Sequence, residues 1–275
     1  MPLLEREEYI EQAYLFGLLN ERQEQGASLQ ELLFQAREEV LGTTRLPLAI
    51  EFLLSELKHA GVIGSAMARL GHYFSAFQTF IVHESEVEGG RFDMATAFRI
   101  LQNEAEYRSK EPTPQGTFMY QFEALCHNRL RYDPGLVAMS QDPIYSSDWQ
   151  AWILTVRRQV GIVDLADLIY VRSEHYAARR RKLGQSDEEV PLLFGEKEGK
   201  IARSNRRKDP RYLFAALQRH LNYPTVPRRA VIDQSRVLIP QLMKRMERLE
   251  QRTKLIEEEQ RGGIDLSRFM PKPKS

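Results

Sequence analysis

The stretch SLQELLFQAREEVLG, residues 28–42, contains both ends of a helix and decides the fold class. Ser28 and Glu31 have the spacing of a capping box, in which each side chain accepts a hydrogen bond from the backbone N–H of the other residue. Apolar side chains recur at helical spacing through the rest of the stretch. Gly42 follows the last of them, where helices commonly stop. The stretch therefore predicts one amphipathic helix.

The segments that follow repeat this pattern. The segment PLAIEFLLSELKHAG, residues 47–61, has Pro47 in its first turn and Gly61 at its end. Further along, six apolar residues alternate at spacings of four and three, which predicts one apolar stripe along a single helical segment. They are Ile63, Met67, Leu70, Phe74, Phe77 and Ile81.

A polar capping residue followed by proline occurs three times later in the chain, and proline is favoured at the first helical position. The three pairs are Thr113-Pro114, Asp133-Pro134 and Asp209-Pro210. Neither an alternating strand pattern of useful length nor a repeat of fixed period competes with the helical pattern. We therefore predict an all-α protein with a multi-helix domain over about residues 1–222.

The composition is that of a folded protein without an overall attraction to polyanions. The 275 residues are 42% hydrophobic and 28% charged, with a formal net charge of +1. Cys126 is the only cysteine, so an internal disulfide is impossible and a reducing compartment is expected. The acidic first residues differ from a signal peptide, and no stretch approaches the ~20 apolar residues of a membrane span. We expect a cytoplasmic protein that does not enter the membrane.

The composition changes after residue 222. Residues 223–235 contain two prolines and are predicted to be a linker, and residues 262–275 are predicted to be a flexible tail. Between them, residues 236–261 predict a coiled-coil helix, because apolar side chains alternate by three and four along a highly charged segment. The seam comprises Ile239, Leu242, Met246, Leu249, Thr253 and Ile256. So narrow a stripe favours a homo-oligomer or another protein partner over packing on the chain's own domain.

Charge is distributed unevenly along the chain. Residues 1–45 carry nine acidic and four basic side chains, whereas residues 179–211 carry eleven basic and six acidic ones. We predict that the two segments partly screen one another within the fold. The basic segment also offers an alternative function, a nucleic-acid-binding adaptor that contacts phosphates. The candidate contacts are Arg203, Arg206, Arg207, Lys208 and Arg211. A solvated or internally paired face is favoured over this alternative, because cations at the end of a helix complement its dipole.

Carboxylates and an imidazole define a third hypothesis, an enzyme or metal site. A single predicted helix over residues 163–183 places Asp164, Asp167 and His175 on one face, where they could perform acid–base chemistry or hold a metal. The competing interpretation is structural, since aspartates in the first turn and a histidine near the end both complement the helix dipole. The sequence assigns no second element to complete such a site.

The stretch FGEKEGKIARSNRRKDP, residues 194–210, fails as a phosphate-binding loop. A P-loop needs four residues between its glycines and a lysine followed by serine or threonine. Here three residues separate the glycines, isoleucine follows the lysine, and Glu196 and Glu198 would repel a phosphate. We predict instead a short helix with an ion pair between Glu196 and Lys200.

Two further motifs contain residue types that bind metals or catalyse reactions, but each lacks the arrangement that such a site needs. Glu56 and His59 have the spacing of a metal-binding pair, but a di-iron bundle needs a second such pair, which the sequence lacks. Cys126 and His127 are adjacent, and neighbours on a helix point about 100° apart, so they cannot act as a nucleophile and its base. The sequence therefore predicts neither a metal nor a cofactor.

The stretches FGEKEGKIARSNRRKDP (194–210), QDPIYSSDWQ (141–150) and EEEQRGGIDLSRF (257–269) resemble an uncharacterised bacterial family of helical proteins. The resemblance spans most of the chain and implies a bacterial cytosolic origin. It assigns neither an activity nor functional residues. The sequence as a whole favours a non-enzymatic intracellular interaction or scaffold protein that self-associates through its C-terminal helix.

Overall fold

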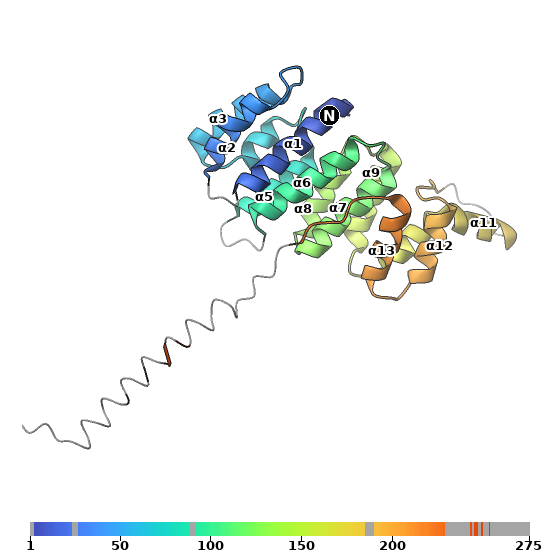
Figure 1. The fold of residues 1–275 in the computed structure, drawn as a ribbon. Coiled ribbons are helices and arrows are strands. Elements are labelled where there is room, and N and C mark those ends of the chain that lie inside the picture. The colour runs from blue at the N-terminus through green and yellow to red at the C-terminus, as the bar shows by residue number, and fades with distance from the viewer. Residues whose placement is uncertain are drawn as a thin grey trace, which may run out of the picture. The chain divides into compact units, whose positions relative to one another are not determined.

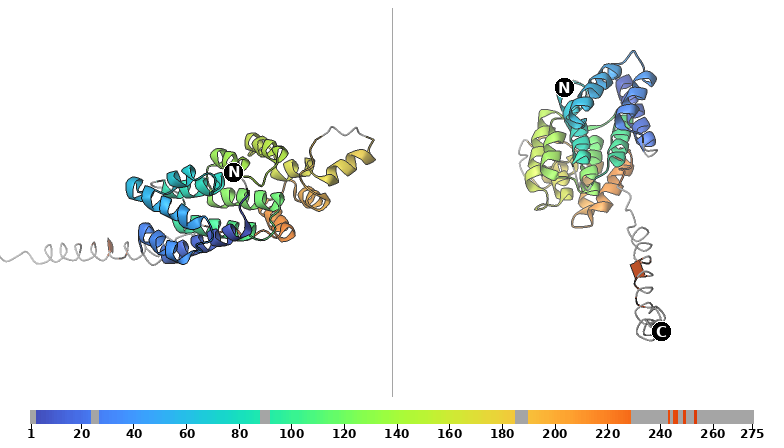
Figure 2. Two further views of the ribbon diagram at one scale, coloured as in Figure 1. Left: turned by 90° about the horizontal axis from the view of Figure 1, so that it is seen from above. Right: turned by 90° about the vertical axis from the view of Figure 1, so that its left-hand side faces the viewer.

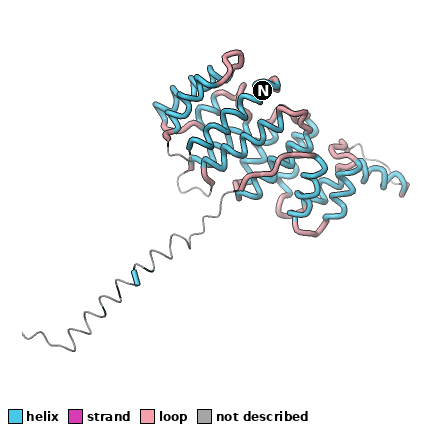
Figure 3. The backbone as a smooth tube through the Cα atoms, in the orientation of Figure 1, coloured by secondary structure: helices cyan, strands magenta, loops and turns pink. Residues whose placement is uncertain are grey.

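The computed structural model describes residues 3–23, 27–87, 92–184 and 190–228, together with five residues further along the chain. These five are Met243, Arg245, Met246, Leu249 and Thr253. The described residues form helices and connecting loops without a β-strand, which confirms the all-α prediction (Figure 3). The helices are α1 (Arg6–Gln23), α2 (Leu29–Glu39), α3 (Leu46–Ala60), α4 (Gly64–Arg69), α5 (Ala76–Glu86), α6 (Met94–Arg108), α7 (Pro114–Asn128), α8 (Tyr132–Ser140), α9 (Ser147–Gln159), α10 (Leu165–Val171), α11 (Glu174–Lys182), α12 (Glu196–Asn205) and α13 (Pro210–Leu221).

The helices of this domain pack mostly in neighbouring pairs (Figure 1). Helix α1 is an exception, because it lies along α6 and so joins the first helices to the middle of the domain. The last helix, α13, contacts both α7 and α12. Helices α2 and α3 lie at one end of the domain and α11 at the other, as the views in Figure 1 and Figure 2 agree.

The capping residues explain most helix starts. The side chains of Ser28, Asp93, Thr113 and Asp209 each accept a hydrogen bond from a backbone N–H of the first turn. Gly61 ends α3 in the left-handed conformation, with φ of 72°. The prediction for Asp133-Pro134 is off in position, because α8 begins at Tyr132 and its N-cap is Arg131. These two residues therefore lie inside the first turn.

The predicted stripe over 63–81 does not belong to one helix. Helix α4 ends at Arg69, and α5 begins at Ala76. A new helix begins at Ala76 because Ser75 and Gln78 form a complete capping box, in which the side chain of each residue accepts a hydrogen bond from the backbone N–H of the other, at 3.2 and 3.0 Å. The apolar residues of the stripe are nevertheless mostly buried, so the pattern marked the core correctly and missed the break.

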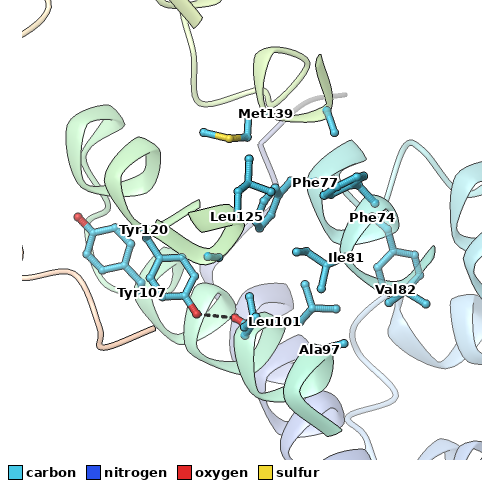
Figure 4. Close-up of a cluster of buried hydrophobic side chains, with 14 of the residues drawn as sticks. Phe74, Phe77, Ile81, Val82, Ala97, Leu101, Tyr107, Tyr120, Leu125 and Met139 are labelled. Atoms are coloured by element: carbon cyan, nitrogen blue, oxygen red, sulfur yellow. Dashed lines mark hydrogen bonds between the residues drawn. The ribbon is translucent and has the colours of Figure 1, made fainter. Parts of the chain in front are cut away.

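The core is formed by side chains from consecutive helices. Figure 4 shows Phe77 and Ile81 of α5, Leu101 of α6, Leu125 of α7 and Met139 of α8 directed into one cluster. All five are buried. A domain of this size gains most of its stability from such apolar burial.

The domain extends beyond the predicted boundary at residue 222. Tyr223 and Val226 are buried, so the start of the predicted linker belongs to the domain, which is described up to Arg228. Residues 229–235 and the tail over 262–275 lie outside the described residues. No helix in the described part of the chain is both long and apolar enough to cross a bilayer.

Candidate functional site

The two predicted aspartates hold the corner between α10 and the loop after α12. Asp164 is the N-cap of α10 and accepts from Ala166 N at 3.0 Å through Oδ1. Its second oxygen, Oδ2, accepts from Arg207 N at 2.7 Å, and Arg207 adopts a left-handed conformation with φ of 58°. Asp167 forms an ion pair with Arg206. Both carboxylates thus connect α10 to the loop after α12.

The single helix predicted over residues 163–183 is wrong, so Asp164, Asp167 and His175 do not share the face of one helix. Helix α10 ends at Val171 and α11 begins at Glu174, because Ser173 caps α11 and donates from its hydroxyl to Tyr170 O at 2.7 Å. Backbone bonds from Leu193 and Phe194 to the carbonyl of Arg172, at 2.9 and 3.1 Å, hold the break open.

His175 and the two aspartates belong to different helices. It lies in the first turn of α11, with its ring 6.1 Å from that of Tyr170. Its Cβ also packs so closely on α12 that a Cβ added to Gly199 would lie 2.8 Å from it. The described residues contain no group of three histidine, cysteine, aspartate or glutamate side chains that could hold a metal ion. The acid–base site around Asp164, Asp167 and His175 stays a prediction, and the described contacts of the two aspartates to other side chains and loops are those with Arg206 and Arg207.

The predicted nucleic-acid contacts are partly occupied by internal partners. Arg206 pairs with Asp167, and its guanidinium lies over the ring of Tyr170 at 5.5 Å. Arg211 pairs with Asp209 at 2.6 Å, and this contact lowers the pKa of Asp209 to about 2. The three remaining candidates are exposed; they are Arg203, Arg207 and Lys208. The corner is basic, but two of its five cations already neutralise aspartates.

The predicted screening between residues 1–45 and 179–211 has no support among the contacts of the described residues. The acidic segment satisfies its charges locally: Glu39 pairs with Arg22 at 2.8 Å, and Glu8 accepts from Arg45 N at 2.9 Å and from the hydroxyl of Tyr73 at 2.9 Å. No ion pair joins the two segments among the described residues. Charges screened by salt interact weakly beyond about 8 Å, and α2 lies at the other end of the domain from α11.

The structure contains a buried ionic network around Arg108 that the sequence did not predict. Arg108 donates to Asp142 Oδ1 at 3.1 Å and to Glu104 Oε1 at 2.9 Å. Gln121 donates to the same oxygen of Glu104 at 2.7 Å and accepts from the hydroxyl of Tyr145 at 2.9 Å. Burial raises the pKa of Glu104, and Asp142 raises it further while Arg108 opposes both. The network is sealed from solvent, so it ties α6, α7 and the loop after α8 together and is closed to a substrate.

A second feature, the strap, is the chain over residues 223–228. The hydroxyl of Tyr223 donates to Glu123 Oε2 at 2.8 Å. Asn103 donates to Thr225 O and Asn128 to Pro227 O, both at 3.0 Å. The strap is thereby fixed to α6 and α7, immediately before the segment that leads to the predicted coiled coil.

The adjacent Cys126 and His127 face different partners, as their position on one helix requires. Burial raises the pKa of Cys126 to about 11. Burial, together with the charge of Arg228, lowers the pKa of His127 to about 4, so its ring is neutral at ordinary pH. Glu56, the first half of the other short motif, pairs with Arg69 at 2.6 Å. None of these groups is arranged as a nucleophile with its base.

Two open grooves lie on the described surface. One, of about 790 Å³, runs between α2 and α3 past Phe34 and His59. The other, of about 750 Å³, lies between the α4–α5 region and α8. The residues of the acid–base hypothesis, Asp164, Asp167 and His175, line neither groove. Neither groove therefore completes that site.

The predicted seam is represented by three described residues. Met246 is 60% exposed and Leu249 is 56% exposed, and both are helical. The hydroxyl of Thr253 donates to Leu249 O at 2.9 Å. The other seam residues, Ile239, Leu242 and Ile256, lie outside the described residues.

Comparison with family models, with curated proteins and with solved structures found no match. The resemblance to a bacterial helical family therefore stays a prediction.

Proposed function

We propose that the chain is a non-enzymatic interaction protein that self-associates through a coiled-coil helix over residues 236–261. The proposal is carried by the exposure of Met246 and Leu249, which are more than half accessible in the single chain. They stand three residues apart on one helical face, where a second copy of the helix would remove both from water. Burying a side chain of this size contributes about 1.5–3 kcal/mol relative to leaving it exposed.

The association we expect is modest. A helix of this length is marginal in water on its own, so it needs a partner surface. Thr253 weakens the contact with a partner, because it places a hydroxyl in the apolar seam. That hydroxyl donates its hydrogen bond to the carbonyl of Leu249 in its own helix. We therefore expect dimers at micromolar concentration that dissociate on dilution.

The alternatives have less support. The acid–base hypothesis requires Asp164 and Asp167 to act with His175, and the aspartates instead bind the loop after α12. The nucleic-acid adaptor would have fewer cations for phosphates, because Arg206 and Arg211 already pair with aspartates. A cytoplasmic location and a bacterial origin are proposed on the sequence alone.

Sedimentation equilibrium of the full chain tests the proposal. We expect a mass of twice 32.0 kDa at micromolar concentration. Leu249→Asp places a charge in the seam and should give a monomer with an unchanged helical domain, as judged by thermal unfolding. Gln251→Asp is the matched control, because it adds the same charge two residues away, outside the seam, and should leave the dimer intact. A wild-type chain that sediments as a monomer would remove the proposal.

A further inference from the structure

The residues beside the seam carry information about the partner's orientation. Residues Ile239, Met246 and Thr253 occupy the first apolar position of successive heptads, and Leu242, Leu249 and Ile256 occupy the second. The described residues place Met246, Leu249 and Thr253 on a helix, with Arg245 immediately before the seam residue Met246. In heptad notation Arg245 is a g position, and Glu250, directly after Leu249, is an e position.

We infer that the partner is a second copy of the same helix, parallel and in register with the first. This inference rests on the proposed self-association and adds its direction. In a parallel pair, each g residue lies beside the e residue five positions further along the partner. By sequence position, this arrangement would pair Arg245 with Glu250 of the second copy and Arg252 with Glu257. Of these four, only Arg245 is among the described residues. All four contacts of the symmetric pair join opposite charges.

The antiparallel arrangement reverses these contacts. It places g beside g and e beside e, so that arginine meets arginine and glutamate meets glutamate. Like charges across a helix interface oppose association, so the charge pattern selects one of two directions that the apolar seam alone would allow. The flanking charges therefore fix the direction, while Met246 and Leu249 supply the apolar area.

The seam also specifies the number of strands. A β-branched residue at the first apolar position with leucine at the second favours two strands in parallel coiled coils. Ile239, Leu242 and Leu249 follow this rule, whereas the unbranched Met246 at a first position and Ile256 at a second position depart from it. The polar Thr253 at a first position lowers stability without contradicting it. We therefore expect a parallel pair of helices and a dimeric chain.

Cysteine cross-linking determines the direction. The variants are Leu242→Cys and Thr253→Cys, and the wild type, whose one thiol is the half-buried Cys126, is the control. In the parallel pair, each variant faces its own copy and forms a disulfide-linked dimer with a mild added oxidant. In the antiparallel pair, residue 242 faces residue 253 of the partner, and the two copies of residue 242 lie about 16 Å apart. That distance exceeds the roughly 7 Å limit for a disulfide between Cα atoms.

The outcomes separate this inference from the proposed function. Cross-linking of each variant by itself supports the parallel pair. Cross-linking only in a mixture of the two variants would overturn the direction and leave self-association standing. A wild-type chain that sediments as a monomer and does not cross-link would remove both. A trimeric mass would overturn the two-stranded pair.

Charge reversal gives a second, independent measurement. Arg245→Glu with Arg252→Glu converts all four attractive contacts into repulsive ones, and we expect the dimer dissociation constant to rise by about 100-fold. The matched control is Lys244→Glu with Arg248→Glu, which makes the same change in charge at positions that face away from the seam. We expect that control to change the constant by less than about threefold. Equal effects of the two double variants would contradict the assigned contacts.

Discussion

Arg108 and Arg206 each bind an aspartate and lie close to a tyrosine ring, but one pair is sealed in the core and the other is open to solvent. The side chains of Arg108 and Asp142 are 2% and 0% exposed, whereas those of Arg206 and Asp167 are 42% and 26% exposed. In the core, removal of one partner leaves an ion that water cannot reach. At the surface, water replaces the lost partner. The same contact therefore has different consequences in the two regions.

The two pairs also differ in what they connect. Arg108 joins Glu104 in its own helix to Asp142, 34 residues away, and Gln121 of α7 completes the cluster. Arg206 joins the loop after α12 to α10. The first arrangement supports three segments of the core, and the second supports one corner at the edge of the domain.

The largest effect is expected from Arg108→Met. The variant leaves Asp142 and Glu104 without their cation, and we expect it to lower the free energy of unfolding by about 3–5 kcal/mol, measured by urea denaturation. Adding Glu104→Gln and Asp142→Asn removes the stranded charges and should recover part of this loss. A loss below about 1 kcal/mol in the single variant would mean that water reaches the cluster.

An intermediate effect is expected from Glu104→Gln, and it depends on pH. Burial holds the pKa of Glu104 above its ordinary value of 4.5, so between these two values the folded chain keeps a proton that the unfolded chain releases. The stability that this proton contributes is complete below 4.5 and is lost as the pH rises through the folded pKa. The glutamine variant has no such loss. Its stability relative to wild type should therefore increase with pH, by at most about 1.4 kcal/mol per pH unit.

Urea denaturation of both chains between about pH 4.5 and about pH 7.5 measures this difference. Other carboxylates with shifted pKa values, such as Asp209, are common to both chains and cancel in the comparison. A constant difference across this range would show that Glu104 has the same proton affinity in the folded and unfolded chains.

The smallest effect is expected from Arg206→Gln. Water can solvate Asp167 once the guanidinium is gone, so the free energy of unfolding should fall by less than about 1 kcal/mol. Raising the salt concentration should reduce the difference between variant and wild type further, because exposed charges are screened. A loss as large as that of Arg108→Met would show that the corner between α10 and α12 is part of the core's cooperative structure.

Local sequence signals predicted most of the helices because capping is a short-range interaction. Thr113 and Asp209 cap their helices as expected, and Glu196 pairs with Lys200 at 2.6 Å. The breaks before Ser75 and at Ser173 were missed for a physical reason: apolar or helical spacing continues through both. Each serine caps the helix that follows it, and the hydroxyl of Ser173 also donates to a carbonyl at the end of the helix before it.

The tertiary contacts were beyond sequence reasoning. The i, i+4 spacing of Glu104 and Arg108 is visible in the sequence, but nothing local indicates that Asp142 completes their cluster. The net charges of residues 1–45 and 179–211 were a poor guide to contacts for the same reason. A count of acidic and basic residues does not say which of them already have partners. Asp164 was predicted within the first turn of a helix and is instead its N-cap, and its second contact, to Arg207, could be found only in the fold.

The strap over residues 223–228 makes the end of the domain a mechanical anchor. Its carbonyls are held by Asn103 and Asn128, and the buried ring of Tyr223 lies behind them. Tension applied from the C-terminal side would therefore reach these hydrogen bonds before it reached α13. The force would pass directly into α6 and α7, the most deeply buried helices of the domain, so that a pull on the C-terminal segment is a pull on the core.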